Sequence, residues 1–342
     1  MITPPLHEWL WPEPVTATPA PGGLINHTWW VDGPAGRHAV VQRLNTDIFT
    51  PRVHDDIEAV THHLAAHGVA TPILLRTRRA RLWAEDDTGV YRALTLVGDR
   101  TVHRLDGPNR LSLAHRAGAL VARVHAALSD LDIAFASVRP GVHDTQAHHA
   151  ALLAALDAHP THRLRDPVGR LADELDRRWA AWDGPRELPT RIIHGDLKIS
   201  NVRFQGDDAI ALIDLDTWQH GTLDAELGDA MRSWCNPSGE DAPQTQVDVE
   251  VFAAAMAGYA HGAPGFATDA EWRGMAPGLE RIALELAMRF AADALNESYF
   301  GFDPAIGAGE HNLLRARGQL ALARAAREAR PDLDAAVAAA RP

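Results

Sequence analysis

One short segment constrains the fold of this chain more than any other. Residues 194–216 read HGDLKISNVRFQGDDAIALIDLD, which predicts a tight His-Gly-Asp turn followed by a hairpin and a short apolar strand. The turn carries Asp196, the strand ends at Asp214, and the amide of Asn201 lies between them. Phosphoryl transfer from a nucleotide requires a base for the acceptor hydroxyl and oxygen ligands for the magnesium ion on the phosphates. Because the protein-kinase catalytic loop has the same order of base, amide and metal-binding aspartate, the segment predicts a site for phosphoryl transfer.

The turn at the start of this segment is the predicted catalytic centre. Asp196 is the predicted base that accepts the proton of the acceptor hydroxyl, and Gly195 permits the tight turn before it. His194 is predicted to hold the loop by hydrogen bonds, with a catalytic role as the alternative. Lys198 is the only lysine of the chain, and we expect it to reach the transferring phosphate as a point charge. The alternative for Lys198 is an ordinary solvated position in a loop.

The amide and the two acids that follow are predicted to bind the metal. Asn201 and Asp214 offer hard oxygen donors, which suit Mg²⁺ on the phosphates of ATP. Asp216 is a further candidate, because residues two apart on an extended segment point to the same side. A solvated turn residue is the alternative for Asp216. The predicted cofactors are therefore ATP and Mg²⁺.

The length and the charge of the chain limit what it can fold into and bind. With 342 residues it is long for a single core, and its 46% hydrophobic content is typical of a globular protein. The formal net charge of -12 argues against a nucleic-acid partner, since a phosphate backbone needs a basic face. We therefore expect a small-molecule substrate, and the oligomeric state stays open.

The cysteine content and the first residues bear on the cellular compartment. The chain has one cysteine, Cys235, which cannot form a disulfide within the chain and is expected to be a small buried apolar residue. The opening MITPPLHEWLWPEP has neither the basic region nor the apolar run of a signal peptide. No stretch approaches the roughly 18 apolar residues of a membrane span. These features predict a cytoplasmic protein without a membrane partner.

The N-terminal part of the chain contains short strand-like runs separated by turn signals. Apolar residues with helical spacing interrupt these runs at residues 55–66. The pattern predicts a small, mostly antiparallel sheet with one helix, preceded by a proline-rich extended arm. The predicted strands are residues 28–31, 39–44, 73–76, 81–84 and 91–97.

After residue 98 the sequence changes to long alanine-, leucine- and arginine-rich stretches with apolar residues three and four apart. Together with the sheet before them and the catalytic hairpin, these stretches predict an α+β, bilobal protein-kinase-like fold. The predicted N-lobe is residues 1–98 and the predicted helical C-lobe is residues 99–342, with the nucleotide in the cleft between them. The apolar stripes lie at residues 113–128, 166–182, 247–260, 279–295 and 312–328.

The N-lobe lacks one residue that protein kinases use to bind the phosphates. Their β3 strand carries a lysine in a V-A-I-K segment, whereas the corresponding stretch here, AVVQRL, has none. Gln42 and Arg43 face opposite sides of this strand, and either one could replace the lysine. Gly22 and Gly23 precede the first strand and could cover the phosphates with their backbone N–H groups, with Asn26 facing the cleft. An ordinary turn is the alternative for this glycine pair.

With these residues placed, the chain resembles the aminoglycoside phosphotransferase superfamily, which shares the protein-kinase-like fold and the H-G-D-x-x-x-x-N and I-D motifs. Within that superfamily the chain is similar to the N-acetylhexosamine 1-kinases. This second resemblance depends on GLINHTWWV, VVQRLNTDIF, VHDT, GDAMR and HNLLRARGQL together with the catalytic segment. It implies ATP- and Mg²⁺-dependent phosphorylation of the anomeric hydroxyl of an amino sugar, with Asp196, Asn201 and Asp214 in the motif positions.

The residues that bind the acceptor are less constrained than the catalytic ones. Sugar hydroxyls need polar partners, and a structural role is the alternative for each candidate. Asp229 and Arg232, for example, stand one helical turn apart and could simply pair with each other. The candidates, on polarity alone, are His27, Arg43, Arg232, Arg289, Asn312 and Arg315.

Two other kinds of function fit the same residues. The acceptor could be an aminoglycoside, choline or homoserine, which other kinases of the superfamily phosphorylate. Alternatively, the chain could be an inactive nucleotide-binding scaffold, because the β3 lysine is absent. The presence of Asp196, Asn201 and Asp214 together argues against the scaffold.

Overall fold

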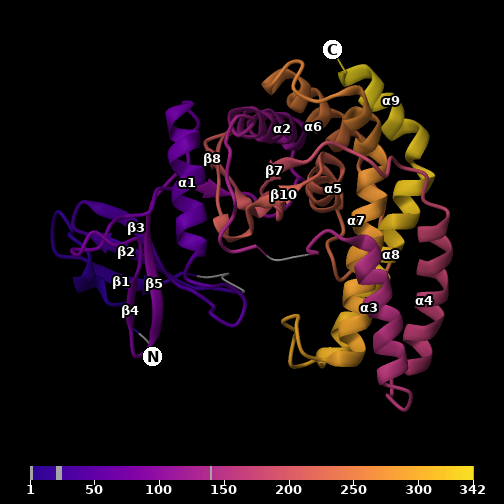
Figure 1. Cartoon of the computed structure of the whole chain (residues 1–342). Coiled ribbons are helices and arrows are strands. Elements are labelled where there is room, and N and C mark those ends of the chain that lie inside the picture. Colours follow the sequence, from indigo (N-terminus) through magenta and orange to yellow (C-terminus); the bar gives the residue numbers. More distant parts are fainter. Residues whose placement is uncertain (1–2, 21–24, 139–140, 342) are drawn as a thin grey trace.

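The computed structural model describes residues 3–20, 25–138 and 141–341, and in it a small sheet lobe lies beside a larger helical lobe (Figure 1). The N-lobe is built on an antiparallel sheet with helix α1, and the C-lobe on helices α2 to α9. The predicted α+β, bilobal, kinase-like fold is thereby confirmed. The division at residue 98 stays a prediction. Within the described residues, no helix combines the length and the apolar content needed to cross a membrane.

The sheet of the N-lobe has five strands in the order β1-β2-β3-β5-β4, and every neighbouring pair is antiparallel. Alternate residues of β2, β3 and β5 are buried on one face, where Trp9 closes a small apolar core. Helix α1 instead packs Ile57, Val60 and Leu64 into the larger core that it shares with the C-lobe. The bounds are β1 Thr16–Pro19, β2 His27–Gly33, β3 Gly36–Arg43, α1 Val53–Ala66, β4 Ala84–Asp86 and β5 Gly89–Thr95.

Three of the predicted strands coincide with β2, β3 and β5, and the predicted helix coincides with α1. The strand predicted at residues 73–76 is wrong, because this segment forms only an isolated bridge from Leu74 to Leu94. The strand predicted at residues 81–84 overlaps β4 only at Ala84. Both discrepancies have one cause: β4 and the Leu74 segment pair with the same edge of β5, so neither has room for a long strand.

The C-lobe packs its helices around a large apolar core. The predicted apolar stripes coincide with α2, α4, α6, α7 and α8, whereas α3, α5 and α9 have no predicted stripe. Helix α5 is buried on nearly every side, and its charged residues Glu226 and Asp229 are buried with the apolar ones. The polar side of α5 therefore lies against the rest of the protein rather than against solvent. The bounds are α2 Arg110–Ala127, α3 Thr145–Ala158, α4 Arg165–Ala180, α5 Leu223–Trp234, α6 Val249–Gly262, α7 Asp269–Asn296, α8 Ala308–Glu328 and α9 Arg330–Ala340.

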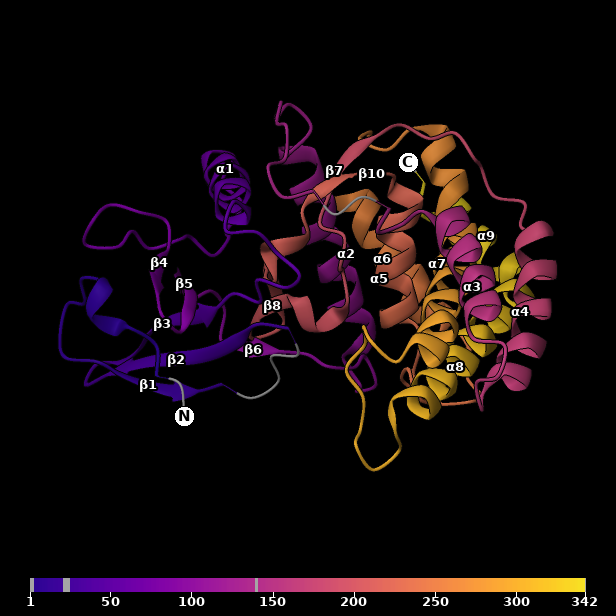
Figure 2. The same cartoon turned by 60° about the horizontal axis from the view of Figure 1, so that its bottom comes forward.

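Short strands between the two lobes carry the catalytic segment, as both views show (Figure 1 and Figure 2). β8 and β9 form the predicted hairpin, and β6 pairs with β8 just after the chain leaves the N-lobe sheet. β7 pairs with β10 and leads into the His-Gly-Asp turn. Helix α5 packs closely on α7: a Cβ added at Gly228 would lie 2.4 Å from the Gly278 carbonyl oxygen. The bounds are β6 Arg100–Thr101, β7 Arg191–Ile193, η2 Ile199–Asn201, β8 Val202–Gln205, β9 Asp208–Leu212, η3 Leu215–Thr217 and β10 Gln219–Gly221, where η2 and η3 are 3₁₀ turns.

Candidate active site

The His-Gly-Asp turn places the predicted base, cation and amide in contact. Gly195 has a φ of +78°, which glycine adopts without strain, and a Cβ there would lie 2.8 Å from the Thr217 carbonyl oxygen. Asp196 Oδ2 accepts hydrogen bonds from Lys198 Nζ at 2.8 Å and from Asn201 Nδ2 at 3.0 Å. Burial raises the pKa of Asp196, but the Lys198 ammonium group outweighs burial, and the net shift of the pKa is downward. Asp196 is therefore ionised at neutral pH.

Asp214 lies near the same ammonium group. Its Oδ2 is 3.9 Å from Lys198 Nζ, and its backbone is left-handed, with a φ of 66° that aspartate tolerates better than most residues. Burial raises the pKa of Asp214 and the Asp196 carboxylate raises it further, while Lys198 opposes both. Two carboxylates thus share one ammonium group, so a further cation beside them would be electrostatically favoured.

Asn201 connects the turn to the hairpin. Its Nδ2 also donates to the Asp196 backbone carbonyl at 2.8 Å, and its own carbonyl accepts from the Ile213 N–H at 2.9 Å. Within the described part of the chain, no hydrogen bond involves its side-chain oxygen, Oδ1. That oxygen is therefore available to a ligand.

Helix α5 holds the catalytic loop through buried carboxylates. Glu226 accepts hydrogen bonds from the backbone N–H groups of His194 and Gly195, at 2.8 and 2.9 Å. Asp229, one turn further along α5, accepts from the Leu197 N–H at 2.9 Å. Sequence reasoning missed Glu226, although an acid among the apolar residues of a helix is a signal that could have identified it. These contacts fix the backbone of the loop from one side.

The His194 side chain ties the loop to the end of the hairpin. Its Nε2 lies 2.9 Å from the Ile213 carbonyl oxygen, and its ring packs edge-on against Trp218. His125 lies 3.2 Å from the Glu226 carboxylate and completes the buried network. These contacts fit the predicted role of His194 in holding the loop.

A buried ion pair joins strand β5 to the turn η3. Arg92 Nη2 donates to Asp216 Oδ2 at 2.8 Å, Arg92 Nη1 contacts Asp216 Oδ1, and the two side chains are 1% and 0% exposed. Asn26 Nδ2 donates to the same Asp216 Oδ2 at 2.7 Å. Gln42 Oε1 accepts from Arg92 Nε at 2.9 Å. Both oxygens of Asp216, a predicted metal ligand, are therefore bound by side chains of the N-lobe.

Sequence reasoning missed Arg92 and looked for the phosphate-binding residue on strand β3, at Gln42 or Arg43. In the sheet, Gln42 is directly opposite Arg92 in the register of β3 and β5. Arg43 points to the opposite face of β3, where its Nε would lie 2.6 Å from a Cβ added at Gly89. Arg43 thus covers the β4–β5 turn, away from the Arg92–Asp216 ion pair. The predicted phosphate-covering residues Gly22 and Gly23 lie outside the described residues.

Among the predicted acceptor residues, Arg232 is linked to the catalytic loop through a shared partner, Asp229. It is buried and forms ion pairs with Asp229 at 2.9 Å and with Glu240 at 2.8 Å. The pairing of Asp229 with Arg232, which the sequence left open, is therefore present. Arg232 also helps to lower the pKa of Asp196, after Lys198 and His194, which places it near the base.

The other predicted acceptor residues are dispersed. Arg289, half-buried on α7, lies over the Phe300 ring, and no carboxylate contacts it within the described residues. Arg315 donates to the Gly301 carbonyl at 2.7 Å. Asn312 is buried and donates to Asp293 at 2.9 Å. His27 is exposed at the start of β2 in the other lobe.

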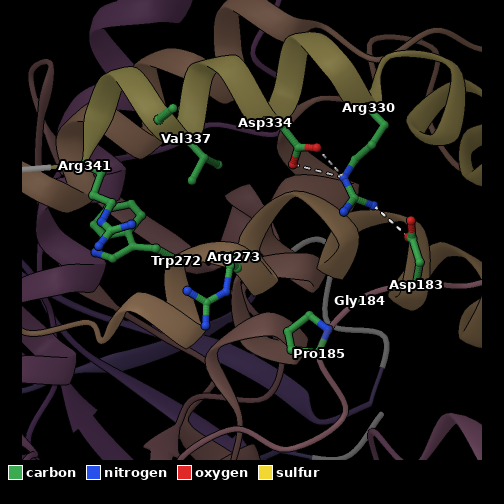
Figure 3. Close-up of a pocket in the computed structure, with 10 residues that line it drawn as sticks. Asp183, Gly184, Pro185, Trp272, Arg273, Arg330, Asp334, Val337 and Arg341 are labelled. Carbon is green, nitrogen blue, oxygen red and sulfur yellow. Dashed lines mark hydrogen bonds and ion pairs between the residues drawn. The ribbon is translucent and has the colours of Figure 1, made fainter.

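A cavity of about 520 Å³ lies in a different part of the C-lobe (Figure 3). Residues of α7, α9 and the 183–185 segment line it, and Arg330 extends between Asp334 and Asp183 at its rim, with distances of 3.0 and 3.3 Å. None of the predicted catalytic, nucleotide or acceptor residues lines this cavity. It is therefore distinct from the site around Asp196.

Comparison with known proteins identifies the class of this chain. The profile of the phosphotransferase enzyme family matches residues 16–273. The match covers most of the chain, so the chain belongs to this family.

Curated relatives of the chain include homoserine kinases. The protein of Rhodopseudomonas palustris (strain HaA2) is 31% identical over 179 residues, which are 52% of this chain and 51% of the relative. The protein of Methylobacillus flagellatus is 25% identical over 289 residues, 81% of this chain and 78% of the relative. The chain thus spans about half the length of the first of these relatives in the matched region.

Solved structures share the fold across nearly the whole chain. An amicoumacin kinase in complex with AMP-PNP, Ca²⁺ and Ami has a TM-score of 0.62 at 14% identity, covering 92% of this chain and 90% of that one. A microcompartment-associated aminopropanol kinase has a TM-score of 0.62 at 16% identity, covering 95% and 96%. At such low identity the likeness concerns the fold alone.

Proposed function

We propose that this chain is a small-molecule kinase that transfers the γ-phosphate of ATP to a hydroxyl group. One observation carries the proposal: Lys198 Nζ lies 2.8 Å from Asp196 and 3.9 Å from Asp214. The Asn201 amide, at 3.0 Å from Asp196, completes the set. These are the groups that phosphoryl transfer requires, and membership of the phosphotransferase enzyme family supports the same reaction.

Asp196 acts on the acceptor in this proposal. Its ionised carboxylate accepts a hydrogen bond from the acceptor hydroxyl and takes up the proton as the new oxygen–phosphorus bond forms and ADP leaves. Lys198, already beside Asp196, is placed to neutralise charge on the transferring phosphate. The α5 carboxylates hold the backbone of this loop, so the geometry exists before the acceptor binds.

The donor set fits a magnesium ion. Asn201 Oδ1 and the Asp214 carboxylate are hard oxygen donors, and the raised pKa of Asp214, caused by burial and by Asp196, reflects a site that lacks positive charge. When bound, the ion would neutralise the phosphates of ATP. Asp216 remains a candidate ligand in the nucleotide complex, where the phosphates would compete with it for Arg92.

Arg92 is our proposed replacement for the β3 lysine. It extends from β5 opposite Gln42, and Asp216 and Asp214 both raise the pKa of its guanidinium group, against the effect of burial. Arg92 is therefore an N-lobe cation in direct contact with Asp216, one of the proposed metal ligands. Asn26 donates to Asp216 as Arg92 does, and we propose that it faces the nucleotide, just after the phosphate-covering residues Gly22 and Gly23.

For the acceptor we propose the anomeric hydroxyl of an N-acetylhexosamine, with a sugar 1-phosphate as product. The support is the set of sequence segments that resemble N-acetylhexosamine 1-kinases, two of which supply Arg232 and Arg315. Homoserine is the second candidate, because the curated relatives are homoserine kinases. Arg289, half-buried without a carboxylate partner among the described residues, is a group that could bind the homoserine carboxylate.

The test is release of ADP from ATP and Mg²⁺ with a panel of acceptors. The panel contains N-acetylglucosamine, N-acetylgalactosamine, glucose, kanamycin, choline and homoserine, and the 1-O-methyl glycoside of N-acetylglucosamine as the matched control. We expect turnover with the N-acetylhexosamines and none with the methyl glycoside, which has no anomeric hydroxyl. Turnover with homoserine alone would identify homoserine, not an N-acetylhexosamine, as the acceptor. If no acceptor raised the rate of ADP release above the rate of the Asp196→Asn variant, the proposal that the chain is a kinase would be contradicted.

A further inference from the structure

Three side chains of types that can bind a metal ion lie together where the end of helix α1 approaches the end of helix α2. His63 and His67 stand one helical turn apart, in and just after α1, and Asp130 follows α2. The ligand atoms that these residues offer all lie within 4.8 Å of one another. We propose that they form a binding site for a divalent transition-metal ion such as Zn²⁺, separate from the magnesium site.

The distances between the side chains suit a single ion. Asp130 Oδ1 lies 2.8 Å from His63 Nε2, and Asp130 Oδ2 lies 3.7 Å from His67 Nε2. Ligands bonded to one tetrahedral ion at about 2.0–2.2 Å lie about 3.4 Å apart. The two spacings to Asp130 bracket this value, and all three ligand atoms lie within 4.8 Å of one another, so rotations of exposed side chains would bring them onto one ion.

The His67 ring is already oriented as a ligand. Its Nδ1 lies 2.9 Å from the His63 backbone carbonyl, which can only accept a hydrogen bond. In the neutral ring Nδ1 therefore carries the proton, and Nε2, which lies 3.7 Å from Asp130 Oδ2, is the nitrogen left to bind an ion. Histidine ligands of metals in proteins are commonly fixed in this way, and a spacing of four residues places two histidines on one helical face.

The His63 ring exchanges a proton for the ion. Its Nε2 lies 2.8 Å from Asp130 Oδ1 and 3.0 Å from the Ala127 carbonyl oxygen, and both oxygens accept. Without an ion, Nε2 therefore carries a proton. An ion that binds Nε2 displaces that proton to solvent, and the Ala127 carbonyl oxygen is then placed to serve as a fourth ligand.

The donor set selects the kind of ion. Two imidazole nitrogens with a carboxylate suit Zn²⁺ and its neighbours, whereas Mg²⁺ and Ca²⁺ prefer oxygen ligands only. Because of this preference, Mg²⁺ would not compete for the two imidazole nitrogens. The site is open to solvent, since the side chains of His67 and Asp130 are 41% and 67% exposed, so an ion can reach it.

The ion would fix α1 to the segment that follows α2. Asp56, near the start of α1, already accepts hydrogen bonds from the Ala136 and Ser137 N–H groups at 2.7 and 2.8 Å. A bound ion would add a second attachment near the other end of α1. The two attachments would restrain movement of α1 relative to the C-lobe.

The test is titration of the metal-free, full-length chain with Co²⁺ in the presence of excess Mg²⁺. We expect one equivalent of Co²⁺ to produce the intense visible absorption of a tetrahedral site with nitrogen ligands, and Zn²⁺ to displace it. His67→Ala and Asp130→Asn should each weaken binding by at least about tenfold. His62→Ala is the matched control: His62 is the neighbour of His63 and is 63% exposed, and among the described residues its one polar contact is Glu58, at 4.0 Å.

Two results would overturn the proposal. One is a weak octahedral spectrum with the unmodified chain, which would indicate oxygen ligands only. The other is equal affinity for Co²⁺ in His67→Ala and in His62→Ala. Far-ultraviolet circular dichroism establishes that each exposed-site variant is folded, and the test does not depend on kinase activity.

Discussion

Arg92 and Asp216 form a buried ion pair that connects the sheet of the N-lobe to the turn after the catalytic hairpin, with Nη2 2.8 Å from Oδ2. The two residues are 124 positions apart in the sequence. Their contact means that the position of strand β5 and the position of the proposed metal ligands are coupled. Breaking the pair should therefore affect both stability and nucleotide binding.

Arg92→Met should lower the free energy of unfolding by about 3–5 kcal/mol, because it leaves the buried Asp216 carboxylate without its positively charged partner. Urea unfolding measures this loss. The double variant Arg92→Met/Asp216→Leu removes both charges and should recover most of it. The single variant Asp216→Leu completes the comparison. If the double variant loses as much stability as the two single variants added together, the ion pair is not the cause of the loss.

Asp196→Asn should reduce kcat by about 10²–10⁴-fold, because the amide cannot accept the proton of the acceptor hydroxyl. Its affinity for the Mg²⁺–nucleotide complex should change little, since Asn201 and Asp214 remain. Asp214→Asn should give the opposite pattern, with the larger loss in nucleotide affinity. Calorimetric titration with a non-hydrolysable nucleotide separates the two; similar nucleotide affinities in both variants would argue against the assigned roles.

Glu226→Gln should slow turnover without contacting the substrate. The new amide group would face a backbone N–H of His194 or Gly195 and leave a buried donor unsatisfied, at a cost of about 1–3 kcal/mol. The matched control is Glu280→Gln, which changes a buried acid paired with Arg327 at 3.0 Å, away from the loop. We expect both variants to lose stability and only Glu226→Gln to lose kcat. Equal kcat values would mean that the loop does not depend on Glu226.

His54 should make the protein less stable as the pH falls from about 6.5 towards 4. Burial, and then the Arg92 charge, lower the pKa of His54 to about 4. Between these values the unfolded chain binds a proton that the native state excludes, so stability rises with pH and the loss at low pH approaches about 3 kcal/mol. Above the ordinary pKa both states are neutral and the effect vanishes.

His54→Phe tests this dependence and keeps a ring to stack on Trp83, which lies 5.2 Å away. The free energy of unfolding, measured from pH 7 to pH 5, should depend less steeply on pH in His54→Phe. The exposed His62→Ala should retain the original slope. An unchanged slope in His54→Phe would mean that His54 is protonated in the native state.

The sequence predicted those parts of the fold whose pattern is local. The alternation in β3 and the helical spacing in α1 each depend on which face is buried, and both elements form where expected. The Leu74 segment does not follow from local pattern, because it depends on how much of the β5 edge β4 occupies. Helix α5 was not predicted, and its charged residues Glu226 and Asp229 are buried together with its apolar ones.

The candidate site shows the same division. Asp196, Lys198 and Asn201 lie within one turn, so their contact could be expected from spacing. Arg92 could not be found in this way, because its proximity to Asp216 depends on the pairing of β3 with β5 and on how the lobes meet. The cavity lined by Arg330 likewise has no counterpart in any sequence motif.

The backbone of the catalytic turn is held by Glu226 and Asp229 of α5, whereas Arg289, Asn312 and Arg315 project from α7 and α8. The helix that holds the predicted catalytic turn, α5, is thus distinct from the helices α7 and α8, which contain most of the residues predicted to select the alcohol. Under the proposed function, substitutions on α8 should alter acceptor choice while leaving the reaction intact. Such a division would allow enzymes that share this scaffold to diverge toward amino acids, sugars or amino alcohols, and under the proposed function an engineered change of substrate would begin on α8.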